Sequence, residues 1–130
     1  MNYREIPSMT PERWIANLIE AADDIADKGK QESRWLAPDA FAWERPEELI
    51  CVLFDDSNFE LFLNEYASTF TDEQRLTAFA LRDELNLYGD ATSKWLNAAE
   101  VLADPRWDAI RQRASVFVAA FKDKWPAIES

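Results

Sequence analysis

The carboxylates are the side chains of this sequence with the clearest capacity for chemistry. Two carboxylates spaced three residues apart share one face of a helix and could hold Mg²⁺ with a matching pair on a neighbouring helix, as in all-α nucleotide pyrophosphohydrolases. Glu20 and Asp23 have this spacing, but the single E-x-x-E pair is Glu44 with Glu47. Pro46 interrupts that pair where a ligand-bearing helix should continue. We therefore expect the acids of residues 20–27 to form a solvated helix face, and we predict no metal ligands.

The usual nucleophilic and phosphate-binding equipment is missing from the sequence. It contains no histidine, which removes Ser-His and Cys-His nucleophiles and most zinc sites. Its one cysteine, Cys51, stands in the apolar run LICVLF, where a cysteine is expected to be buried. Two glycines cannot build a phosphate-binding loop. Glycosidase-like carboxylate pairs stay open, because their separation in space decides them. We predict a protein that is not an enzyme and that needs no cofactor.

Negative charge is concentrated in the middle of the chain. The formal net charge is −11, and residues 39–65 hold eight acids against one base, Arg45. One interpretation is local, since acids suit helix starts and favour solubility. The other is a negative face that attracts a basic protein, with an aromatic anchor. The predicted partner-binding residues are Asp39, Trp43, Glu44, Glu47, Glu48, Asp55, Asp56 and Glu60.

Charge and hydropathy disfavour two other kinds of partner. A surface this acidic repels phosphates, so we expect no direct binding of nucleic acid. No apolar run approaches the roughly 18 residues of a membrane span. The first residues, MNYREIPSMTPERW, lack the basic start and apolar stretch of a secretion signal. These patterns predict a cytoplasmic protein with no membrane partner.

Helix start and stop signals divide the chain into helical segments. Thr10-Pro11 begins the first, with an apolar stripe from Trp14 to Ala26 and an expected end at Gly29. Residues 30–45 are expected to form a connection, with at most a short helical turn near Pro38. Pro46 opens the second segment. Its apolar body, residues 49–54, could also be a buried strand.

The remaining segments carry clearer signals. Capping boxes at residues 57–60 and 71–74 begin the third and fourth helices. The fourth should end at Gly89, with Leu76, Phe79, Ala80 and Leu87 on one face and Ala78, Leu81, Leu85 and Tyr88 around the side. A short fifth helix, containing Leu102, should start at Asp90 or Thr92. Asp104-Pro105 opens the last helix, which should run to about Lys124 with Trp107, Ile110, Ala114, Phe117 and Phe121 on its apolar stripe.

These elements predict an all-α protein, a compact helical bundle or orthogonal array of about five to six helices in a single domain over residues 1–130. A surplus apolar face on the fourth or the last helix could serve a homodimer. The leading functional hypothesis is a bacterial immunity protein or antitoxin that covers the cationic site of a nuclease-type toxin. The alternatives are a DNA-mimic inhibitor of a DNA-handling protein and a Mg²⁺-dependent pyrophosphohydrolase.

Overall fold

The described part of the chain consists of helices joined by short connections. The computed structural model describes residues 10–35, 46–91 and 98–125. Its elements are α1 (Pro11–Ala26), α2 (Lys28–Trp35), α3 (Pro46–Cys51), the π-helical turn η1 (Val52–Asp56), α4 (Phe59–Tyr66), the 3₁₀ turn η2 (Ala67–Thr69), α5 (Asp72–Ala91), α6 (Ala98–Ala103) and α7 (Pro105–Phe121). The predicted all-α class is confirmed. The strand alternative for residues 49–54 is wrong, because these residues continue the helix of α3 into η1.

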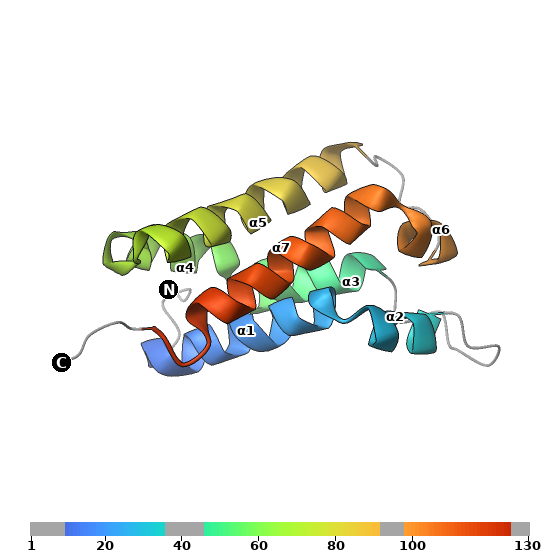
Figure 1. The fold of residues 1–130 in the computed structure, drawn as a ribbon. Helices are drawn as coiled ribbons and strands as arrows, with labels where there is room; N and C mark the ends of the chain where they lie inside the picture. The colour runs from blue at the N-terminus through green and yellow to red at the C-terminus, as the bar shows by residue number, and fades with distance from the viewer. Residues whose placement is uncertain (1–9, 36–45, 92–97, 126–130) are drawn as a thin grey trace, which may run out of the picture.

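Helix α7 occupies the centre of the helical array. It lies between α1 and α5 and runs opposite to both, with α3 and α4 behind it (Figure 1). Its buried stripe is the predicted one, Trp107, Ile110, Ala114, Phe117 and Phe121. Aromatic contacts join this stripe to α4, α5, α2 and the connection between η2 and α5, with ring centroids 5.6 Å apart for Phe59–Phe117 and for Tyr88–Trp107, 5.1 Å for Phe70–Phe121 and 6.4 Å for Trp35–Trp107. The buried stripe of α7 is therefore the part of the core that the other helices contact.

The first predicted connection contains a helix. α1 ends at Ala26 with Asp27 as its C-cap, so the expected end at Gly29 is wrong, and Gly29 lies inside α2. The reason is a side-chain cap, since the Asp27 carboxylate accepts a hydrogen bond from the Lys30 backbone N–H at 2.9 Å and starts a new helix at once. Residues 36–45, including the turn expected near Pro38, lie outside the described residues.

The face that α5 buries differs from the apolar face that was predicted to contain Leu76 and Leu87. The capping box is confirmed by reciprocal 3.0 Å bonds between Thr71 and Gln74. The helix passes through Gly89, its predicted end, and continues to Ala91. Leu76 is 72% exposed and Leu87 is 65% exposed. The buried positions are instead Ala78, Leu81, Leu85 and Tyr88, because they share one stripe with Gln74, which binds α7.

Two further local predictions are corrected around α3 and α4. Cys51 is exposed rather than buried, because Leu49 and Leu53 take the inward positions on either side of it. The capping box at residues 57–60 does not form. Asn58 adopts a left-handed conformation (φ 54°) without a side-chain cap, while the buried Ser57 carbonyl accepts a 2.8 Å hydrogen bond from the Trp14 indole N–H. The long-range hydrogen bond between Trp14 and Ser57 thus fixes the connection between η1 and α4.

The other helix boundaries are close to those expected. Thr10 caps α1 through the Arg13 N–H at 3.1 Å, and Asp104 caps α7. The last helix ends at Phe121, three residues before the predicted Lys124. Of the two predicted starts of the fifth helix, Asp90 is wrong because it lies inside α5, and Thr92 lies outside the described ranges; α6 begins at Ala98. Within the described ranges no helix has the length and apolar character needed to cross a membrane.

Two buried glutamines tie the helix ends to α7. The Gln31 amide nitrogen donates to the carbonyls of Asp24 (2.9 Å) and Ile25 (2.7 Å) at the end of α1, and its oxygen accepts from Trp107 Nε1 at 3.1 Å. The Gln74 amide donates to the carbonyls of Ala120 (3.1 Å) and Lys124 (3.2 Å) at the end of α7. Terminal carbonyls have no partner within their own helix, so these amides meet a specific need.

We expect the Gln31→Leu variant to lose about 3 kcal/mol of unfolding free energy, because it leaves buried carbonyls and the Trp107 N–H without partners at nearly constant volume. Urea unfolding measures this change. The control is Glu32→Leu, the same new side chain at the exposed neighbouring position, with an expected effect within about 0.5 kcal/mol. Equal midpoints for the two variants would contradict the role given to Gln31.

Candidate protein-binding face

Exposed carboxylates line the outer side of α3 and η1. Leu49, Leu53 and Ser57 are buried, and Ile50 and Phe54 are partly buried against the core. Glu48, Asp55 and Asp56 are exposed, together with Val52, which is 39% exposed. A helical period thus places three acids around an apolar residue on one side of the chain.

Helix α1 lies beside this segment and adds acids of its own. The Trp14–Ser57 bond joins the start of α1 to the end of η1. At the other end of α1, Asp24 shares a small surface pocket with Leu49 of α3. The two elements therefore run antiparallel, and Glu20 and Asp23 project from the exposed side of α1. The term acidic face is used below for Glu20, Asp23, Glu48, Asp55 and Asp56.

The members of the acidic face are not neutralised by their neighbours. None of the five makes an ion pair with another residue of the described ranges. Other acids nearby are paired, since Asp24 lies 2.9 Å from Lys30 and Glu60 lies 3.5 Å from Arg82. The hydrogen bond with Asp24 raises the pKa of Lys30. The acidic face therefore carries charge that the described fold leaves uncompensated.

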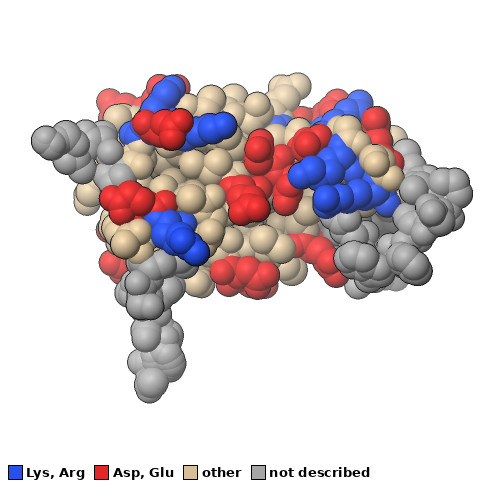
Figure 2. Space-filling view, turned by 90° about the horizontal axis from the view of Figure 1, so that it is seen from below, with Lys and Arg blue, Asp and Glu red and all other residues tan. Residues whose placement is uncertain are grey.

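Basic side chains lie toward both ends of this side of the molecule. Figure 2, which views the molecule from the α1 side, shows acids across the middle, one group of bases toward the α2 end and further bases at the opposite end. Helix α2 contributes Lys28, Lys30 and Arg34. The negative surface therefore lies between basic side chains at its two ends.

The structure brings together part of the predicted partner-binding set. Glu48, Asp55 and Asp56 share one exposed side, whereas Glu60 is partly exposed and paired with Arg82. The backbone of Glu47 belongs to α3, but its side chain lies outside the described residues, as do Asp39, Trp43 and Glu44. Glu20 and Asp23 were not in the predicted set. Their helical spacing identified an exposed stripe of α1, and the structure shows that α1 lies beside α3 and η1.

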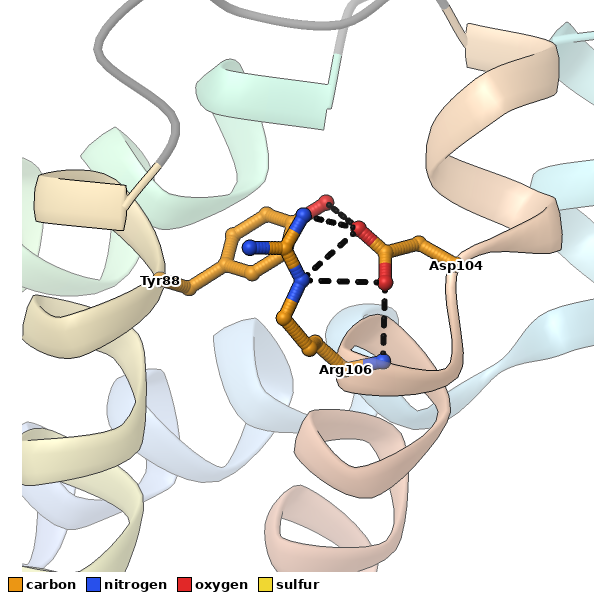
Figure 3. Close-up of polar contacts among 3 residues, drawn as sticks. All are labelled: Tyr88, Asp104 and Arg106. Atoms are coloured by element: carbon orange, nitrogen blue, oxygen red, sulfur yellow. Dashed lines mark hydrogen bonds and ion pairs between the residues drawn. The ribbon is translucent and has the colours of Figure 1, made fainter.

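A separate polar cluster joins the end of α5 to the start of α7 (Figure 3). Asp104 accepts hydrogen bonds from the Arg106 backbone N–H at 2.9 Å, from Arg106 Nη2 at 2.7 Å and from the Tyr88 hydroxyl at 3.2 Å. The Arg106 guanidinium also lies 5.2 Å from the centre of the Tyr88 ring. Burial raises the pKa of Tyr88 to about 12, so its phenol stays protonated at neutral pH. In this cluster Asp104 caps α7, and the Tyr88 hydroxyl connects the cap to α5.

No other arrangement of side chains points to a reaction in the described part of the chain. Among its residues, no group of three or more histidine, cysteine or acidic side chains is placed to hold a metal ion. Comparisons of the chain with protein-family models, with curated proteins and with solved structures find no match. The uncompensated charge of the acidic face is therefore the feature with the most direct functional meaning.

Replacing Asp104 by alanine should lower the unfolding free energy by about 1–2 kcal/mol, because it removes the α7 cap and the hydrogen bond that Asp104 accepts from the Tyr88 hydroxyl. Urea unfolding gives the value, and Glu73→Ala at an exposed position of α5 is the control. An unchanged midpoint for Asp104→Ala would contradict the capping role.

The same cap should make stability depend on pH. Hydrogen bonding from Arg106 lowers the pKa of Asp104 below its ordinary 3.8. Because the folded value is depressed, the ionised carboxylate stabilises the fold above about pH 4, and this contribution is lost as the pH falls through the folded value. We expect the stability gap between wild type and Asp104→Asn, which keeps a capping side chain, to shrink below about pH 4. A gap that stays constant in urea unfolding down to about pH 2.5 would refute this.

Proposed function

We propose that this protein binds a basic protein partner through the acidic face, and that it acts as an immunity protein or antitoxin that covers the cationic site of a nuclease-type toxin. The observation that carries the proposal is the set of five exposed carboxylates on α1, α3 and η1 without ion pairs to other described residues. Nuclease sites are positively charged because they bind phosphates, so an anionic protein surface is complementary to them.

The geometry of the acidic face suits rapid and tight association. Its carboxylates are carried by helical elements packed on the core, so little backbone freedom is lost on binding. Like charges held close together repel, and a cationic partner relieves that repulsion. Val52 lies among Glu48, Asp55 and Asp56 and offers an apolar contact inside a charged rim, the usual composition of an interface.

The distribution of charge favours a compact toxin cover over a DNA mimic. A DNA mimic needs acids spread along an extended face to imitate spaced phosphates. In this chain α5 and α7 together carry six acids and five bases, so the surplus lies elsewhere. The described surplus is concentrated on α1, α3 and η1, which supports a compact contact with a basic partner.

Reversal of charge on the acidic face should slow association with the partner. Capture from native cell lysate at low salt, elution by raised salt and mass identification provide the partner in pure form. Against it, Asp55→Lys/Asp56→Lys should reduce the association rate at least about tenfold at low salt, with a much smaller effect at high salt, because screening removes the attraction.

The matched control is Glu32→Lys/Glu73→Lys, which makes the same change in net charge at exposed positions on α2 and α5. It should alter the rate far less than the variant at Asp55 and Asp56. Equal slowing by both variants would mean that only net charge matters, and an unchanged rate for Asp55→Lys/Asp56→Lys would place the contact on another surface. Loss of the partner's own nuclease activity on binding tests the inhibitory part of the proposal.

Titration with Mg²⁺ separates this proposal from the hydrolase hypothesis. We expect millimolar Mg²⁺ or Mn²⁺ to leave the thermal midpoint unchanged and to release no binding heat, because the paired-carboxylate arrangement of such hydrolases was not found in the described residues. A saturable heat, together with stabilisation that Glu20→Gln removes, would favour the metal-dependent enzyme.

A further inference from the structure

An apolar groove runs along the outer side of α5 and α7. The two helices lie side by side and antiparallel (Figure 1). Leu76, Thr77 and Ala80 of α5 and Ala109, Gln112, Arg113 and Val116 of α7 line a groove of about 340 Å³. The term α5–α7 face is used below for these residues together with Leu87. This surface lies across α7 from α1, so it is separate from the acidic face.

The exposed apolar side chains of the described chain gather on the α5–α7 face. Four large hydrophobic residues are exposed in the described ranges, and three of them, Leu76, Leu87 and Val116, lie on α5 and α7. Leu76 and Leu87 are 11 residues apart, which is about three helical turns, so they project from the same side of α5. Ala80 and Ala109 leave the centre of the face low enough for another helix to approach closely.

The α5–α7 face also belongs to two helices that carry little net charge to oppose self-association. The chain carries −11, yet α5 and α7 together carry only −1. The charges beside the groove are partly paired within the molecule, since Arg113 lies 3.7 Å from Glu84 across the two helices. A highly basic partner would be drawn to the acidic face, whereas a second copy of this acidic chain meets little repulsion at the α5–α7 face.

We propose that the α5–α7 face binds the same face of a second copy and forms a two-fold symmetric dimer with a four-helix interface. If α5 pairs antiparallel with α5 of the second copy, Leu76 opposes Leu87 of that copy and Ala80 opposes Asp83. The two leucines then form two equivalent contacts, as an isologous interface requires, and between them each Asp83, which pairs with Arg82 of its own chain at 2.9 Å, meets an alanine. α5 has 20 residues and so is about 30 Å long, which sets the length over which the two copies can touch along this helix.

The dimer leaves both acidic faces exposed, so one assembly can hold two basic partners. The proposal does not depend on the proposed function, because the two surfaces are formed by different elements. Its failure would be a monomer that still binds the basic protein, and failure of the proposed function would be a dimer that captures none.

Sedimentation velocity over a range of protein concentrations tests the dimer. We expect the wild type to form a species of twice the 15.1 kDa chain mass. Leu76→Glu/Leu87→Glu should weaken dimerisation at least about 100-fold, because four apolar side chains in the interface become charged. Leu76→Ala/Leu87→Ala should weaken it by a smaller factor and guards against misfolding, with circular dichroism checking that both variants keep their helices.

The control Asn64→Glu/Ser68→Glu adds the same charge at exposed positions of α4 and η2, away from the groove, and should still dimerise. A wild type that stays at 15.1 kDa at several hundred micromolar would overturn the proposal. So would a dimer that survives the leucine substitutions, because its interface would then lie on another surface. Recovery of a monomer with another protein bound to the α5–α7 face would also overturn the proposal, because this face would then bind a different protein and not a second copy.

Discussion

The arrangement around α7 depends on one requirement: the backbone carbonyls at the helix ends need hydrogen-bond donors. These carbonyls have no N–H donor within their own helix, and in a packed interior water does not reach them. Gln31 and Gln74 supply the donors at the ends of α1 and α7, and each connects segments far apart in the sequence. Gln31 also accepts from the Trp107 indole, so the same side chain that closes α1 positions the start of α7.

The central place of α7 divides the surface into two regions of different character. On the α1 side, exposed carboxylates of α1, α3 and η1 stand without ion pairs to other described residues. On the α5 side, nearly balanced charges surround an apolar groove. Charge attracts a partner over long distances, whereas apolar contact acts only after encounter. The two proposed associations therefore use different forces and need not compete.

Local signals in the sequence predicted much of the fold because their interactions span only a few residues. Thr10, the Thr71–Gln74 box and Asp104 cap helices through bonds that their own neighbours complete. The capping box at residues 57–60 was wrong, because burial of Ser57 and its bond to Trp14 outweighed the local pattern. The prediction of a helix end at Gly29 was wrong for a local reason, because Asp27 caps the next helix before Gly29 is reached.

The sequence by itself determined the all-α class, the apolar stripe of α7 and the surplus of negative charge, because composition and helical period do not depend on what packs where. Only the tertiary structure decided which side of α5 is buried, that Cys51 is exposed, and that α1, which carries Glu20, lies beside α3 and η1. A helix with apolar residues on two sides buries the side that a neighbouring helix covers. Residues distant in the chain share a surface only when their elements pack together.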